Sequence, residues 1–158
     1  MTSRGQRGLV AALLLASCGA LAHAQAPNST TVYPVQALSF GLLLPGVPDA
    51  VPVTDMARRA MVALAGTGAV DVTLVLPTSL TAPDGGTIPL QFGASDAAVL
   101  QSAGSTPAPM NPYQVNRVHL APDRMVYFLL GGAALPSRAQ RPGHYSARVL
   151  IIVSQPGT

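Results

Sequence analysis

Prolines interrupt this chain at short intervals, and their spacing limits what the chain can form. All 15 prolines of the 158-residue sequence lie after residue 26. A proline inside a helix removes a backbone donor and clashes with the preceding turn, so long helices do not fit between prolines this close together. Short strands joined by turns do fit, because sheets accommodate proline at strand ends and edges. The spacing therefore predicts a β-rich chain.

Alternating apolar and polar residues place strands between these breaks. In the clearest run, every second residue from Val70 to Leu76 is apolar, and the run stops at Pro77. A period of two is typical of a strand with one buried face. Shorter runs with the same boundaries predict further strands at Val35–Phe40, Thr87–Phe92, Met125–Leu130 and Tyr145–Val153.

Turn residues separate these runs. Asp84-Gly85-Gly86 predicts a turn rather than a calcium loop, because no further carboxylate follows at ligand spacing. Pro89 predicts an edge position for its strand, and the three prolines, glycine and serine of residues 103–112 predict a mobile loop or linker. We therefore expect an all-β fold, an antiparallel immunoglobulin-like β-sandwich formed by residues 34–158 after an N-terminal extension at residues 25–33.

Residues 54–66 are open to two interpretations. Thr54 is a possible helix cap, Gly66 a possible stop, and the residues between them are good helix formers. Local propensity therefore favours a helix. The alternative is a turn followed by a strand at Ala60–Ala65.

Residues 1–24 are typical of an export signal. Arg4 and Arg7 give a positive start, and an apolar stretch at residues 8–21 follows. This stretch is shorter than the ~20 residues that span a bilayer. Small residues before the junction predict cleavage between Ala24 and Gln25. We therefore expect an exported protein, located in the periplasm or on the surface of a bacterium.

The segment around Cys18 allows a second interpretation. Residues 15–18, followed by Gly19, are similar to a bacterial lipobox, in which the cysteine is lipidated and becomes the first residue of the mature chain. Acyl chains on Cys18 would tether the protein to a membrane. Residues 19–21 stay apolar, which favours cleavage after Ala24 instead. In that case the mature chain holds no cysteine and no disulfide.

Charge is sparse and unevenly placed. The formal net charge of +3 includes Arg4 and Arg7, so the chain after cleavage has seven Arg against six Asp and lies near +1. Residues 25–96 hold two Arg and five Asp, whereas residues 97–158 hold five Arg and one Asp. This division has two interpretations: electrostatic complementarity between successive subunits, or charges that scatter over the surface of one folded domain. Charged residues make up only 9% of the chain, which argues against nucleic-acid binding.

Several different short motifs are spread over residues 35 to 154. They are Ala37-Leu38-Ser39-Phe40-Gly41, Leu44-Pro45-Gly46, Val51-Pro52-Val53, Ala57-Arg58, Val70 to Pro77 with Ser79-Leu80, Gly131-Gly132, Leu135, Pro142-Gly143-His144-Tyr145, and Val149, Ile151 and Val153. Together they resemble a family of exported bacterial domains catalogued as domain of unknown function 4402. The resemblance implies a single immunoglobulin-like or pilin-like sandwich without a family-wide activity. It also implies a strand, not a helix, at Ala60–Ala65.

The last strand departs from that family. Members usually alternate threonine and valine there, whereas residues 149–153 of this chain are apolar at every position. A strand with two apolar faces is either buried on both or lacks a partner on one.

These features predict a non-catalytic structural or surface domain, a fimbrial or pilin-like subunit that assembles with other protein subunits by β-strand addition. The segment Thr30–Phe40 has apolar residues at alternate sites and is the expected donor. In the simpler alternative, Val35–Phe40 is the first strand of the chain's own closed sandwich. A second function is a lipoprotein binding or scaffold module anchored through Cys18.

A hydrolase is the remote alternative, and it would need one of the two histidines of the mature chain, His119 or His144. The sequence lacks a Gly-x-Ser-x-Gly elbow, a phosphate-binding loop and a dinucleotide motif. Zinc would require three or four ligands from a chain that holds no glutamate and, after cleavage, no cysteine. We therefore expect no catalytic residue, no cofactor, no metal site and no small-molecule substrate.

Overall fold

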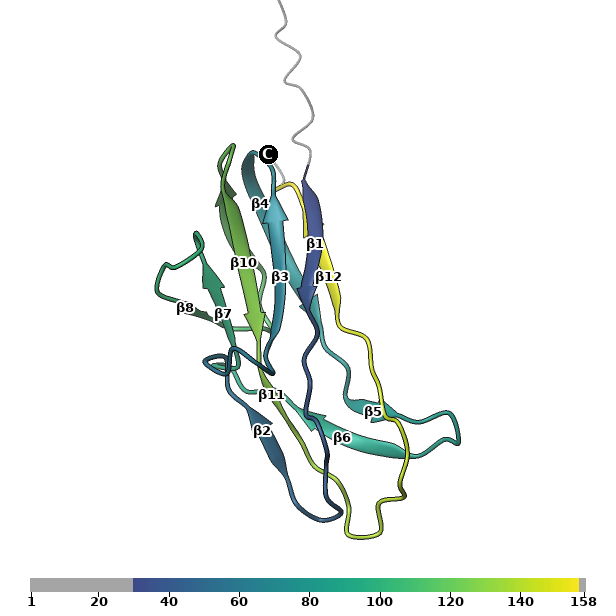
Figure 1. Cartoon of the computed structure of the whole chain (residues 1–158). Helices are drawn as coiled ribbons and strands as arrows, with labels where there is room; N and C mark the ends of the chain where they lie inside the picture. Colours follow the sequence, from purple (N-terminus) through teal and green to yellow (C-terminus); the bar gives the residue numbers. More distant parts are fainter. Residues whose placement is uncertain (1–29, 157–158) are drawn as a thin grey trace, which may run out of the picture.

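The protein is all-β and built from antiparallel pairs of strands (Figure 1). The structure, a computed structural model, describes residues 30–156. No helix in this part of the chain is long and apolar enough to span a membrane. The strands are β1 Thr31–Gln36, β2 Asp49–Val51, β3 Ala60–Ala65, β4 Gly68–Val75, β5 Ser79–Thr81, β6 Thr87–Gln91, β7 Ala97–Leu100, β8 Ala108–Met110, β9 Asn116–Leu120, β10 Met125–Leu130, β11 Gly132–Ala134 and β12 Leu150–Ser154.

Two sheets enclose the main core in a sandwich-like arrangement. One has five strands in the order β1-β3-β10-β7-β8, and the other has three in the order β12-β4-β9. Their inward side chains interlock in one cluster, to which the five-stranded sheet contributes Leu64 and Phe128 and the three-stranded sheet contributes Val72 and Leu120. Burial of these apolar side chains is the main force that holds the sheets together.

A third sheet of four strands, in the order β2-β11-β6-β5, extends the molecule at its lower end in Figure 1. A smaller hydrophobic cluster, which includes Phe40, Val51 and Ile88, packs against this sheet. The chain passes from the five-stranded sheet into this one at Gly131, where β10 ends and β11 begins. A Cβ on Gly131 would overlap the carbonyl oxygen of Val51 in β2, so only glycine permits the chain to approach β2 this closely.

Ion pairs join residues within the chain. The Arg58 guanidinium lies 2.9 Å from Asp49 and 2.8 Å from Asp55, and Arg117 lies 2.8 Å from Asp71. The Arg58 hydrogen bond holds the pKa of Asp55 below its ordinary value, and the Arg117 hydrogen bonds do the same for Asp71. The Asp71–Arg117 pair connects the acidic first half of the chain to the basic second half.

Several strand predictions are confirmed. Residues 70–75 of the predicted run lie in β4, which begins at Gly68, and Val70, Val72 and Leu74 are buried. Residues 125–130 form β10, and residues 87–91 form β6. Residues 54–59 form turns and Ala60–Ala65 forms β3, so the strand implied by the family resemblance is correct and the helix favoured by local propensity is wrong. Pairing with strands on both sides overrides that propensity.

The turn at Asp84-Gly85-Gly86 is also confirmed. It joins β5 to β6, and the Asp84 carboxylate accepts a hydrogen bond from the Gly86 N–H at 3.2 Å.

The first and last strands lie elsewhere than expected. The first is Thr31–Gln36 rather than Val35–Phe40, because the Gln36 side chain bonds to the Arg59 and Met56 carbonyls and the chain then leaves β3. Three residues of the expected extension, 31–33, therefore pair in the sheet. The last strand is Leu150–Ser154 rather than Tyr145–Val153, since the residues before it pair only through a bridge between Ser146 and Thr81.

Two proline-based predictions are wrong. Pro89 lies in β6, which is not an edge strand but has β5 on one side and β11 on the other. The Pro89 carbonyl faces β11 and accepts the Leu135 N–H at 2.9 Å. Because Leu135 lies just past the end of β11, that strand does not need the backbone N–H that Pro89 lacks. The expected mobile loop at residues 103–112 contains β8, an edge strand that pairs only with β7 and accommodates Pro109.

Candidate binding groove

The two sheets that enclose the core each end in an edge strand on the same side of the molecule. β1 is the last strand of the five-stranded sheet, and β12 is the last strand of the three-stranded sheet. They lie side by side in Figure 1, yet no ladder joins them in the described part of the chain. We call this open side of the sandwich the seam.

The upper part of the seam holds a cavity of about 360 Å³. Its apolar walls are Val32 of β1 and Ile151 and Val153 of β12, and Val70 of β4 also lines it. Ile151 also lines a much larger cavity below, so the two cavities adjoin at this residue.

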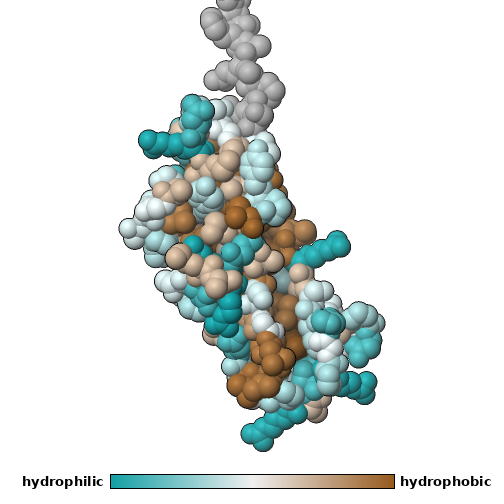
Figure 2. Space-filling model, viewed as in Figure 1, coloured by the Kyte–Doolittle hydropathy of each residue, from teal (hydrophilic) through white to brown (hydrophobic). Residues whose placement is uncertain are grey.

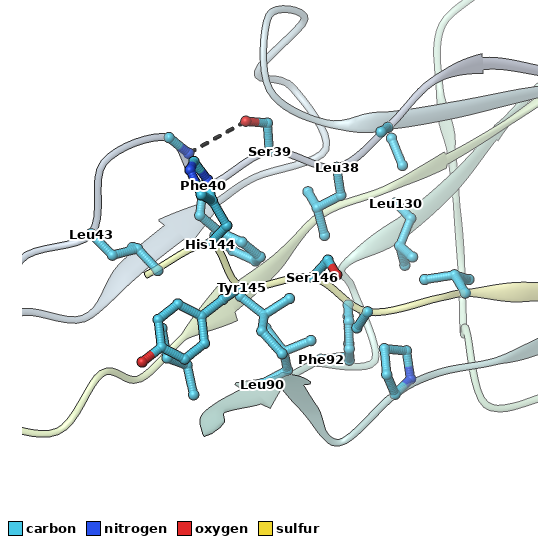
Figure 3. A pocket seen from close by; sticks show the side chains of 18 of the residues that line it. Leu38, Ser39, Phe40, Leu43, Leu90, Phe92, Leu130, His144, Tyr145 and Ser146 are labelled. Carbon is cyan, nitrogen blue, oxygen red and sulfur yellow. Dashed lines mark hydrogen bonds between the residues drawn. The ribbon is translucent and has the colours of Figure 1, made fainter. Parts of the chain in front are cut away.

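The larger cavity, which we call the groove, has a volume of about 1030 Å³. It lies between residues 37–45, which follow β1, and residues 140–149, which precede β12. Its lining includes side chains of both hydrophobic clusters, so the groove opens directly into the core (Figure 3). These shared side chains are Phe40, Leu74, Ile88, Phe92, Phe128 and Leu130.

Both rims of the groove carry backbone groups without a strand partner. On one rim, the Ser39 N–H donates to the Arg58 carbonyl at 2.9 Å, and no other backbone pair is formed by residues 37–43 within the described chain. On the other rim, Ser146 exchanges two hydrogen bonds with Thr81, and residues 147–149 form none with the backbone of residues 30–156. Free backbone donors and acceptors along an apolar opening are the features of an unpaired sheet edge.

Polar side chains also lie along the rims. Tyr145 is fixed in place, because its hydroxyl donates to the Arg141 carbonyl at 2.9 Å and accepts from Gln140 Nε2 at 2.7 Å. Ser39 and His144 lie near the mouth in Figure 3. Ser39 Oγ accepts the Gly41 N–H at 3.3 Å, which bends the chain at this rim.

The candidate residues identified from the sequence lie in different places in the structure. Cys18, Ala24 and Gln25 lie outside the described residues. His144 stands on the groove rim, whereas His119 lies on β9 opposite Ala69 and lines neither cavity. No hydrogen bond within residues 30–156 joins either histidine to a serine or a carboxylate, and the same residues hold no group of three or more possible metal ligands.

Sequence reasoning missed the groove itself. One signal pointed towards it, the apolar last strand. Ile151 and Val153 of β12 are half-buried against the core, while Leu150 and Ile152 remain 55% and 51% exposed. The outer face of β12 therefore has no partner among residues 30–156.

A scan against protein-family models and a search of curated proteins find no match to this chain. The groove therefore has to be interpreted from its own geometry.

Proposed function

We propose that the protein is a non-catalytic structural subunit that assembles with other protein subunits by accepting an extended segment in the groove. The observation that carries this proposal is an apolar cavity of about 1030 Å³ with unpaired backbone on both rims. An added strand would satisfy these backbone groups and send every second side chain into the cavity. A small ligand would fill the volume but leave the rims unpaired.

The donor that we propose is the amino-terminal segment of another copy, from Gln25 through Gln36. In its own sheet this segment is poorly buried: residues 31–35 of β1 are all exposed, and Val32, Tyr33 and Val35 are among them. Among the described strands β1 pairs with β3 alone, and its register shifts after Pro34. A strand that is paired on one side only, by an irregular ladder, costs little free energy to detach from its sheet.

Two further features belong to this proposal. The sandwich would be of the immunoglobulin-like or pilin-like type, as the resemblance to domain of unknown function 4402 implies. The subunit would be exported to the periplasm or cell surface, with the signal at residues 1–24 removed. Mass spectrometry of the mature amino terminus separates this from the lipoprotein alternative, since one predicts Gln25 and the other a lipidated Cys18.

The groove is tested by filling it. Ala60 lies on β3, is packed against the main core and lines the groove, so Ala60→Phe would place an aromatic ring where the added strand must lie. The matched control is Ala69→Phe on β4, since Ala69 neighbours the buried Val70 and points to the opposite face. We expect Ala60→Phe to abolish oligomers in size-exclusion chromatography with light scattering and Ala69→Phe to retain them.

The donor is tested separately by deleting residues 25–36. If the groove accepts this segment, the deleted chain forms no oligomer alone but binds a synthetic peptide of residues 25–36. A protein that is monomeric both before and after the deletion would contradict strand exchange. Oligomers that survive the deletion but are lost in Ala60→Phe would leave the groove as the binding site and reject this donor.

A further inference from the structure

An exposed apolar loop forms the end of the molecule opposite the described chain ends. Residues 41–47 form the tip of the connection from β1 to β2 at the lower end in Figure 1, whereas Thr30 and Pro156 lie at the upper end. Leu42, Leu44 and Val47 in this loop are 90%, 57% and 52% exposed. Figure 2 shows the corresponding apolar patch at the lower end of the molecule. Side chains this exposed add nothing to the core, so folding does not account for them.

The loop is held in a defined shape. Its backbone turns at Gly41 and Gly46, which have φ angles of +66° and +73°. The Gly46 N–H donates to the Ser137 carbonyl at 2.9 Å, and the Val47 N–H donates to the Leu44 carbonyl at 3.1 Å. These two hydrogen bonds and the two glycines in left-handed backbone conformation fix the loop with its apolar side chains projecting. Little conformational freedom therefore remains to be lost on binding.

Cations flank this loop. The Arg138 side chain packs against it, since a Cβ on Gly46 would come within 2.7 Å of Arg138 Cγ. Arg138 and Arg141 are exposed and form no ion pair with the described residues. Asp49, the acidic residue that follows the loop, is already held by Arg58 at 2.9 Å. The lower end therefore combines projecting aliphatic side chains with two arginines that form no ion pair with the described residues.

We infer that this end docks on a membrane surface that contains anionic lipids. The aliphatic side chains of the loop enter the boundary between headgroups and acyl chains, while Arg138 and Arg141 contact phosphate groups. Arginine suits this position because its apolar stem can lie along the loop while the guanidinium stays at headgroup level. A protein segment in the groove would also contact Leu42 and Leu44, which line it, so the test below uses Val47, which does not line it.

This inference does not depend on the strand-acceptor proposal. Val47 and Arg138 do not line the groove, so substitutions at these two positions can change membrane binding without changing strand addition.

Co-sedimentation with lipid vesicles tests the inference. The chain is prepared from Gln25 onward, which keeps every strand of the described structure. We expect it to sediment with vesicles of phosphatidylethanolamine and phosphatidylglycerol and only weakly with phosphatidylcholine vesicles. Val47→Asp should lower the partition coefficient about tenfold, because one aliphatic contact is lost and a like charge faces the lipid. The matched control, Val75→Asp on β4, replaces a valine that is 45% exposed and should bind as the unchanged chain does.

A second substitution separates the electrostatic contribution from the apolar one. Arg138→Gln should weaken binding to phosphatidylglycerol vesicles about fivefold and leave binding to phosphatidylcholine unchanged. The inference is overturned if the unchanged chain does not sediment with anionic vesicles. It is also overturned if Val47→Asp and Val75→Asp behave alike, because binding would then not involve the loop. Thermal unfolding followed by circular dichroism confirms that each variant is folded.

Discussion

Replacing Leu74 by alanine tests whether the groove is open in solution. Leu74 and Leu120 belong to the same core cluster and to the same three-stranded sheet. They differ in surroundings: Leu74 is 8% exposed and lines the groove, whereas Leu120 is 1% exposed and does not. The same substitution at the two positions therefore compares an open site with an enclosed one.

The expected magnitudes follow from what each substitution leaves behind. Leu120→Ala removes buried methyl groups and creates an enclosed void, which together cost about 3 to 4 kcal/mol of the free energy of unfolding. Leu74→Ala removes the same groups, but the space joins an opening that already exists, so no new enclosed cavity forms. Its cost is then mainly the transfer free energy, about 2 kcal/mol. We expect a difference of about 1 to 2 kcal/mol between the two variants.

Urea unfolding measures this difference. Far-ultraviolet circular dichroism and tyrosine fluorescence follow the transition, since the chain has no tryptophan. The comparison requires equal denaturant dependence in both variants, so that midpoints convert to free energies. Equal losses at Leu74 and Leu120 would show that the walls of the groove close in solution, and the strand-acceptor proposal would lose its main support. In assembled protein the cost of Leu74→Ala should rise towards that of Leu120→Ala, because an added strand encloses the site.

Two further predictions concern the fold. Gly131→Ala would press a Cβ onto the Val51 carbonyl oxygen and should cost about 2 to 3 kcal/mol, whereas Gly85→Ala, at a turn with φ of +85° and open space around it, should cost about 1 kcal/mol. Similar urea midpoints for the two variants would contradict the close approach of β2 and β11. Because Arg117 lowers the pKa of Asp71 in the folded protein, the ionised carboxylate stabilises the fold above about pH 4, and this contribution is lost as the pH falls through the folded-state pKa. Asp71→Asn should therefore lose less stability than the unchanged chain between about pH 6 and about pH 3, and equal acid sensitivity would count against this pair.

Local sequence patterns were sufficient for the strands in the middle of the chain. Val70 to Leu76 and Met125 to Leu130 have their own periodicity or apolar character and are bounded by turn residues, so their identity does not depend on distant partners. Residues 60–65 were different, because alanine and leucine are compatible with both a helix and a strand. Their conformation is set by pairing with β1 and β10, a contact between distant segments that no local window contains.

The outer segments were mispredicted for the same reason. Residues 37–40 and 145–149 have strand-like sequences but form no ladder within the described chain, since their backbone pairs only at Ser39 with Arg58 and at Ser146 with Thr81. Pro89 was assigned to an edge from its missing N–H alone, although what matters is whether a neighbouring strand requires that donor.

The sequence by itself determined that the chain is β-rich and antiparallel, because proline spacing and side-chain alternation act over a few residues. Only the tertiary structure decided that the sandwich stays open between β1 and β12, because a groove is the space left between two sheets and has no residue pattern of its own. The same holds for the lower end of the molecule. Leu42 and Arg138 are 96 residues apart in sequence, and the hydrogen bond from Gly46 to Ser137 and the packing of Arg138 against Gly46 bring their loops together.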